Sequence, residues 1–321
     1  MVNHWRFTSC SRKRVTGFLY NVFSGIEYGD MQLISEAYNL LMNGTSLSHD
    51  EIADVFTEWN KGVLDSYLIE ISAAVFRYKD ETGETLLPKI RDSAGQKGTG
   101  KWTAIAGLTY GMPVTLIAEA VFARCLSALK DERVVAAKKL AGPREELRKV
   151  IPDTKTFIQD LHDALYASKI VSYAQGFMLM AEASRHFNWK LNFGAIALMW
   201  RGGCIIRSRF LGDIKKAFDA DPNLSNLLLD DFFCKALAKA QNSWRSVCCV
   251  ATCIGIPVPA FSSALAFYDG YRQAMSPANL IQAQRDYFGA HTYEMLSNPG
   301  NFVHTNWTGT GGRVTSATYQ A

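Results

Sequence analysis

The sequence is poor in proline, carries little net charge and has no long apolar run. Nine prolines in 321 residues argue against a proline-rich linker or a low-complexity chain. Lys and Arg total 34 and Asp and Glu total 30, so the net charge of +4 argues against nucleic acid as a partner. No stretch reaches the roughly 18 consecutive apolar residues of a membrane span, so we expect no membrane partner.

The seven cysteines form no CxxC pair and have no histidine near them in the sequence. Cys249 and Cys253 are four residues apart, which places them on one face of a helix. A metal site would need more ligands than these two thiols. We therefore expect no metal ion, and small buried cysteines in a reducing compartment.

Apolar residues recur mostly at helical spacings, and the alternation typical of paired strands is scarce. One such stripe consists of Leu64, Leu68, Ile71, Val75 and Tyr78, at spacings of three and four. No rhythm of strand, helix and strand is visible. The sequence therefore predicts an all-α fold without a parallel sheet.

Two local signals mark helix starts. Ser48 followed by Glu51 is a capping box, which opens a helix. Pro113 stands where a first-turn proline would precede the next predicted helix. Helices are predicted over residues 50–59, 114–130, 156–187, 194–200, 205–218, 227–254, 260–275 and 277–294.

Two glycine-rich stretches, residues 88–101 and the tail from residue 298, interrupt the helical pattern. The tail is polar and lacks a helical period, so it is either disordered or extended over another surface. Phe302, His304 and Trp307 favour a docked tail, because aromatic residues are depleted in disordered segments.

Residues 95–103 nearly match the phosphate-binding P-loop pattern G-x-x-x-x-G-K-[ST]. Trp102 stands where a Ser or Thr hydroxyl should hold magnesium, and residues 88–92 are not an apolar strand. A nucleoside triphosphatase is therefore disfavoured. Glycine N–H groups with Lys97 and Lys101 could still bind a phosphate, and the alternative is a surface turn with solvated lysines.

Two further clusters of polar residues are ambiguous by themselves. Glu27 and Tyr28 lie between two glycines, where a glutamate in a first helical turn usually only complements the helix dipole. Arg285 and His291 are six residues apart, and a bend at Gly289 would let both face one ligand.

Five segments together resemble the 6-phosphogluconate dehydrogenase family, the decarboxylating NADP enzymes of the pentose phosphate pathway. They are IRDSAGQKGTGKW at residues 90–102 and residues 25–31, 196–208, 280–294 and 302–307. The resemblance runs from about Val22 to Ala321 and implies the family's large all-helical domain. The expected organisation is a divergent leader over 1–21, a helical substrate-binding and dimerisation domain over 22–297, and an extended tail over 298–321.

The resemblance implies one catalytic residue and six substrate-binding residues. Glu27 would help to protonate the enediol carbon that remains after decarboxylation. A sugar phosphate carries about two negative charges and is bound well by cations and fixed donors. The residues expected to bind 6-phosphogluconate are Tyr28, Lys97, Thr99, Arg124, Arg285 and His291. The last two would come from the other subunit of a homodimer with exchanged tails.

Two features of the family are missing from the sequence. A Rossmann domain with a G-x-G-x-x-G-type turn would precede the helical domain, and no such segment lies before Val22. We therefore expect an incomplete chain without the NADP-binding domain and without cofactor-binding residues. The family's lysine base, seven residues before the glutamate, is replaced by Tyr20. A tyrosine, with a reference pKa of about 10, is a poor base at neutral pH.

The function that the resemblance implies is NADP-dependent oxidative decarboxylation of 6-phospho-D-gluconate to D-ribulose 5-phosphate, in the cytoplasm. The alternative is a catalytically inactive helical dimerisation module that pairs with full-length subunits. The basic leader, with Arg6, Arg12, Lys13 and Arg14, has a composition shared with transit peptides, although an irregular extension is the preferred interpretation. We expect that this chain alone does not reduce NADP.

Overall fold

The computed structural model describes residues 11–144, 146, 150–151, 153–201 and 203–309. Within these residues the fold is almost entirely helical, with a single two-stranded sheet, which confirms the all-α prediction. Contacts divide the chain into two compact units, Met1–Phe267 and Tyr268–Ala321. No helix in the described ranges is both long and apolar enough to cross a membrane.

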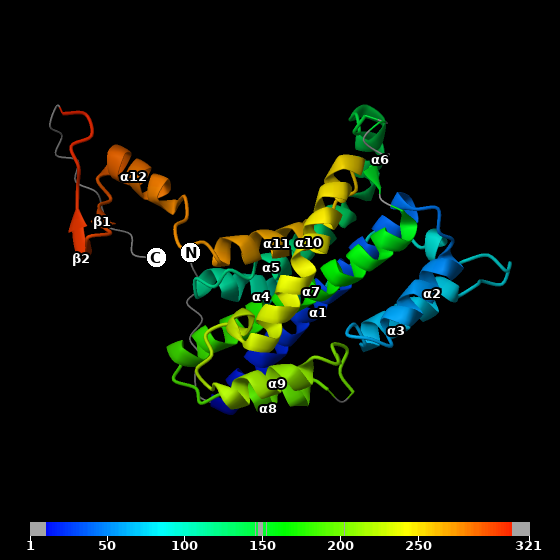
Figure 1. Cartoon of the computed structure of the whole chain (residues 1–321), viewed down its shortest axis with the longest axis horizontal. Coiled ribbons are helices and arrows are strands. Elements are labelled where there is room, and N and C mark those ends of the chain that lie inside the picture. Colours follow the sequence, from blue (N-terminus) through cyan, green and yellow to red (C-terminus); the bar gives the residue numbers. More distant parts are fainter. Residues whose placement is uncertain (1–10, 145, 147–149, 152, 202, 310–321) are drawn as a thin grey trace. The chain divides into compact units, whose positions relative to one another are not determined.

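Three long helices form the centre of the first unit. Figure 1 shows them side by side: α1 (Ser11–Gly44), α7 (Thr154–His186) and α10 (Asp231–Ile254). Residues 164–177 of α7 are buried without a break, which is typical of a helix packed on all sides. A Cβ at Gly176 would lie 2.5 Å from Ile26 Cδ1, so the glycine permits the close approach of α7 to α1. A buried ion pair between Lys169 and Asp30 joins the same two helices.

Shorter helices cover this centre. α4 (Thr99–Thr109) and α5 (Thr115–Ala128) pack on α1 and on each other, and α2 (His49–Trp59) packs on α3 (Tyr67–Arg77). The remaining elements of the first unit are η1 (Leu87–Lys89), α6 (Lys130–Lys139), α8 (Phe193–Met199), α9 (Leu211–Ala220), η3 (Leu227–Leu229) and most of α11 (Pro259–Tyr271).

The second unit consists of α12 (Ala278–Gly289) and a hairpin of β1 (Tyr293–Met295) and β2 (Asn298–Val303). The predicted boundary between residues 297 and 298 falls in the turn of this hairpin, whereas the contacts divide the chain between 267 and 268. The predicted boundary between 21 and 22 falls inside α1, because the helix already begins at Ser11.

Several predicted helices are confirmed, with shifted ends. The capping box opens α2: Ser48 Oγ accepts the Glu51 N–H at 3.3 Å, and the Glu51 carboxylate accepts the Ser48 N–H at 2.8 Å. Pro113 lies just before the N-cap Val114 of α5 instead of in its first turn.

Two helix predictions are wrong in part. The helix predicted from residue 205 begins only at Leu211, because Arg207 and Arg209 instead make backbone hydrogen bonds to the segment that enters α3. The helix predicted to residue 294 ends at Gly289, because Ala290 and Thr292 adopt positive φ angles of 49° and 59°. Such angles cannot continue a right-handed helix.

The expectation of buried cysteines is also wrong. Cys125, Cys234 and Cys249 are exposed, and the other three described cysteines are half-buried; all six are free thiols. Five of them lie on helices and Cys204 lies between α8 and α9, so helical spacing alone did not indicate burial. In the part of the chain that the structure describes, no three His, Cys, Asp or Glu side chains gather to hold a metal ion.

Candidate functional site

The glycine-rich loop, residues 90–98, connects η1 to α4 and leads into α4 next to α1. Gly98 is the N-cap of α4. Gly100 lies against the ring of Tyr28, where a Cβ would come within 2.5 Å of Cδ1, so only a glycine permits this approach. The Thr103 hydroxyl donates a hydrogen bond to the Asn21 carbonyl on α1. These contacts fix the start of α4 beside Tyr28.

The structure excludes the P-loop interpretation of this loop. A P-loop connects a strand to a helix, and the element before residues 95–98 is the 3₁₀ turn η1. Trp102, which replaces the magnesium-binding hydroxyl, is half exposed on α4. The loop therefore presents backbone N–H groups and lysines without a nucleotide-binding fold.

Arg124 of α5 is the central cation of the candidate site. Its guanidinium carbon lies 3.6 Å from the centroid of the Tyr28 ring, which is a close cation–π contact. Arg124 Nη1 donates to the Gly95 carbonyl at 3.1 Å, and Nη2 contacts Met31 Sδ at 3.5 Å. The guanidinium is thus fixed between α1 and the glycine-rich loop. Five donors on a planar fork make such a group a good partner for a phosphate.

Glu27 lies directly before Tyr28 and is half-buried. Burial raises the pKa of Glu27, and the positive charge of Arg124 offsets part of this rise. Burial also lowers the pKa of Arg124, while Tyr28 and Glu27 raise it. A carboxyl group with a raised pKa keeps its proton at higher pH than usual, as a general acid requires.

The first unit thus brings together five of the predicted residues. Glu27 and Tyr28 come from α1 and Arg124 from α5, and Lys97 and Thr99 flank Gly98 in the loop that Arg124 contacts. Lys97 is exposed, and Thr99 is the half-buried first residue of α4. These residues are far apart in the sequence and meet because α4 and α5 both pack on α1.

The other two predicted residues belong to the second compact unit. Arg285 lies near the end of α12, where its Nη1 donates to Gln282 Oε1 at 2.8 Å. His291 lies in the bend that follows α12, close to Gly289. The bend near Gly289 that the sequence suggested is present, and the role of both side chains at the substrate stays a prediction.

The position of the family's lysine base carries an aromatic residue, Tyr20. Tyr20, two helical turns before Glu27, is 60% exposed. Its ring stacks on Phe23 with centroids 6.4 Å apart, and Phe23 lies 5.7 Å from the ring of Trp200. These rings pack on one another and offer no amine to the site.

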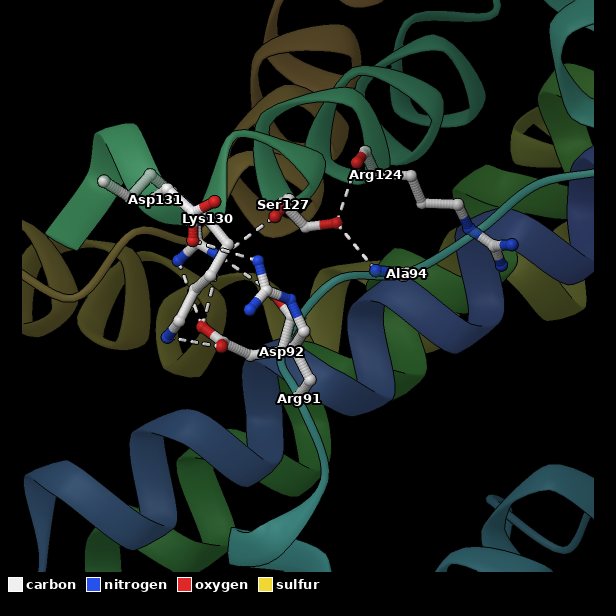
Figure 2. A network of polar contacts seen from close by, with 8 residues as sticks. Arg91, Asp92, Ala94, Arg124, Ser127, Lys130 and Asp131 are labelled. Carbon is white, nitrogen blue, oxygen red and sulfur yellow. Dashed lines mark hydrogen bonds and ion pairs between the residues drawn. The ribbon is translucent and has the colours of Figure 1, made fainter.

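The sequence did not predict a network of charged and hydroxyl side chains at the start of the loop, around Asp92 and Ala94. It joins Asp92 to Lys130 and Arg133, and Ser127 to Ala94 (Figure 2). The partners lie 33 to 41 residues apart in the sequence, and no spacing rule links them.

The comparisons with known proteins agree with this geometry. A family model described as "6-phosphogluconate dehydrogenase, C-terminal domain" matches residues 17–307. The chain belongs to this family. The match begins five residues before Val22, where the resemblance was expected to start.

Decarboxylating 6-phosphogluconate dehydrogenases are close relatives of the chain. The protein from Caenorhabditis elegans is 69% identical and the protein from Homo sapiens 62% identical, each over 304 residues that cover 95% of this chain. The same alignments cover 63% and 62% of those two proteins, so the chain spans less than two thirds of their length.

A solved structure has the same fold. It is the Plasmodium falciparum 6-phosphogluconate dehydrogenase, described in its apo form and in complex with its cofactor NADP+ and with its substrate 6-phosphogluconate. The two chains are 41% identical with a TM-score of 0.83, over 90% of this chain and 62% of the other.

The described residues do not form a dinucleotide site of the Rossmann type. The strands β1 and β2 form an antiparallel hairpin, and the loop of residues 95–98 follows a 3₁₀ turn. A dinucleotide site of the Rossmann type lies where parallel strands meet helix N-termini. We therefore assign no described residue of this chain to the cofactor.

Proposed function

We propose that this chain supplies the substrate-binding domain of an NADP-dependent, decarboxylating 6-phosphogluconate dehydrogenase, which forms ribulose 5-phosphate. The observation that carries the proposal is the guanidinium of Arg124, fixed over Tyr28 and against Gly95 at the start of α4. The names of the relatives support the reaction, and the family resemblance supports the cytoplasm as its compartment.

The phosphate of the substrate would bind at the glycine-rich loop. Arg124 offers a forked donor, Lys97 a second charge, and Thr99 a hydroxyl. The first N–H groups of α4 have no acceptor within the helix, and the helix dipole favours an anion there. Such a site recognises the phosphorylated end of the substrate and leaves the carboxylate end to face Glu27.

Glu27 would act after decarboxylation. In the proposed reaction the C3 hydroxyl would lose its proton, and carbon C3 would give up its hydride to NADP. The β-keto acid that forms would then lose carbon dioxide. The enediol that remains needs a proton on carbon. Burial raises the pKa of Glu27, which favours this carboxyl as the group that supplies the proton. Tyr20 stands in place of the base for the first step, so binding of the substrate does not by itself imply turnover by this chain.

We further propose that the chain forms a homodimer in which the second unit of each copy contributes residues to the substrate site of the other copy. Its surface carries many exposed apolar side chains, an arrangement that marks interaction surfaces. They are Leu280, Ile281, Tyr287, Phe288, Leu296 and Phe302. Arg285 and His291 of one copy would then complete the phosphate site of the other.

Calorimetric titration of the full chain with 6-phosphogluconate tests the substrate. We expect saturable binding that inorganic phosphate displaces, and much weaker binding of gluconate, which lacks the phosphate. Lys61→Gln, which removes an exposed cation remote in sequence, is the control and should bind like the parent. Equal affinities for gluconate and 6-phosphogluconate would contradict the proposal.

Mixing two variants with impaired substrate binding tests the homodimer. Arg124→Met and Arg285→Met should each bind poorly alone. Because a mixed dimer contains one site with both arginines intact, mixing the two should restore part of the binding. Light scattering should give twice the mass of one chain. A monomeric mass at micromolar concentration, or no restoration in a mixture that does form dimers, would count against exchange between subunits.

A further inference from the structure

The glycine-rich loop is bound along one side of α5 and the start of α6. Ala94 donates its N–H to Ser127 Oγ at 2.9 Å, and Gly95 accepts from Arg124 at 3.1 Å. Gln96 Nε2 contacts Cys125 Sγ at 3.7 Å. Three consecutive loop residues therefore contact the last turns of the helix that carries Arg124.

Ser127 connects the loop directly to Arg124. Its hydroxyl donates to the Arg124 carbonyl at 2.7 Å and accepts the Ala94 N–H, so it bridges the two backbones (Figure 2). A shift of the loop relative to α5 would break this bridge and would leave the Ala94 N–H without its partner.

Arg133 of α6 closes the network. Its Nη2 donates to the Asp92 carbonyl at 2.8 Å and to the Ser127 carbonyl at 3.0 Å, and both Nη1 and Nη2 reach Asp92 Oδ2 at 3.1 Å. One guanidinium thus joins the loop, the end of α5 and α6. Hydrogen bonds from a charged donor are stronger than neutral ones.

Asp92 is paired from both sides. Lys130 Nζ lies 2.5 Å from Oδ1, opposite the contacts of Arg133 with Oδ2. The hydrogen bond from Lys130 and those from Arg133 lower the pKa of Asp92 to about 2. Asp92 is therefore ionised throughout the physiological range. Because its side chain is partly exposed, the ion pairs alone contribute little, and the backbone contacts of Arg133 matter more.

We propose that Arg133, acting with Asp92 and Ser127, is a positioning residue that fixes the glycine-rich loop and Arg124 as one rigid phosphate-binding unit. The inference rests on the proposed function of the site. Arg133 contacts the loop and the end of α5, and it acts through them. Without it, the loop N–H groups and the guanidinium of Arg124 no longer keep one fixed spacing, so a phosphate loses simultaneous contacts.

The test is the affinity of the full chain for 6-phosphogluconate and for inorganic phosphate. We expect Arg133→Gln to weaken both by about tenfold, the effect of losing one or two charge-assisted hydrogen bonds. Arg133→Lys, which keeps the charge, should recover part of the loss. Ser127→Ala should show a smaller loss of affinity for both ligands. This variant provides the test if Arg133→Gln does not fold.

Arg91→Gln is the matched control. Arg91 lies next to Asp92 and pairs with exposed Asp131 at 3.1 Å, so its removal takes the same charge from the same region without touching the loop backbone. We expect unchanged affinity. Amide hydrogen exchange should become faster over residues 93–98 in Arg133→Gln and stay unchanged in Arg91→Gln.

The outcomes separate this inference from the proposed function. A parent chain that binds neither 6-phosphogluconate nor phosphate overturns both. A parent that binds, together with an Arg133→Gln that binds equally well or an Arg91→Gln that loses as much, overturns the positioning role alone. Loss of binding in Arg133→Gln with unchanged exchange over 93–98 would also overturn it.

Discussion

The two compact units are stabilised in opposite ways. The first buries large apolar side chains such as Trp244, Phe56 and Phe157 among its long helices. In the second, Asp286 is the one buried residue among residues 268–309. Its carboxylate accepts hydrogen bonds from the N–H groups of Thr292 and Thr305, from the His304 ring and from the Trp307 indole. One unit has an apolar core, and the other is organised around a single charge.

The difference supports the proposal that the second unit docks on another copy of the chain. A segment of this size with an exposed apolar surface gains little free energy from its own contacts. The hydrogen bonds to Asp286 give the second unit a defined shape, while its exposed apolar side chains remain available for contact with another surface. The first unit has its own core and carries most of the candidate site.

The largest expected effect concerns the cations of the two units. Arg124→Met should weaken 6-phosphogluconate binding by about 100-fold, because it removes a forked cation from a half-buried site. Arg285→Met should weaken it by only about tenfold, since Arg285 reaches the site only in the proposed dimer. Calorimetry on the parent and both variants measures the two losses of affinity and their ratio. Equal losses at concentrations where the chain is monomeric would contradict the proposal that Arg285 reaches the site only in the dimer.

Removal of the Asp286 carboxylate should loosen one unit and spare the other. Asp286→Ala leaves four donors without their acceptor and so removes the hydrogen bonds that order this unit. We expect faster amide exchange over residues 268–309 and an unchanged thermal midpoint for the first unit. Glu294→Gln, which alters one exposed hydrogen bond to Gly300, is the control. Protection of 268–309 that survives in Asp286→Ala would refute the central role of this charge.

The two units should respond to pH in opposite directions. Burial raises the pKa of Glu36 to about 7, although the N–H groups of Ala260 and Phe261 bond to it. The folded first unit therefore binds this proton more tightly than the unfolded chain. Its contribution to stability is complete below the ordinary value of 4.5 and is lost as the pH rises to about 7. Urea unfolding of the parent and of Glu36→Gln over this range measures it, and identical slopes would contradict it.

The second unit should lose stability at acid pH instead. Burial by itself would raise the pKa of Asp286, but the four hydrogen bonds outweigh it and lower the pKa to about 2. The contribution of Asp286 is therefore complete above the ordinary value of 3.8 and is lost as the pH falls to about 2. The indole N–H signal of Trp307 in NMR reports this change directly. A signal that already shifts above pH 4 would refute it.

The smallest expected effect is the loss of one helix cap in the first unit. Ser48→Ala removes the side chain that accepts the Glu51 N–H. It should lower the free energy of unfolding by about 1 kcal/mol. Chemical denaturation measures the change, with Ser48→Thr as the control that keeps the hydroxyl. Exchange over residues 268–309 should not respond, and a response there would mean that the two units unfold together.

Local sequence signals predicted the helices and the family motif well. The capping box before α2 and the helical pattern of residues 156–187 depend only on neighbours within a few turns, and both helices are confirmed. The same signals failed at residues 205–210 and 290–294, where backbone contacts elsewhere in the chain and positive φ angles end the helical pattern. The prediction of buried cysteines also failed, because burial depends on which side of an element packs against another element.

The sequence by itself determined the all-helical architecture and the family, because helical period and motif residues are local properties. The candidate phosphate ligands are what the family resemblance implies. Only the tertiary structure decided that Arg124 lies over Tyr28, 96 residues earlier in the chain, and that Arg133 joins Asp92 to Ser127. It also decided that Asp286 is buried and joins α12 to the segment of Thr305 and Trp307. Such contacts follow from how helices pack on α1 and from how the chain bends after α12, and packing between distant segments leaves no fixed spacing in the sequence.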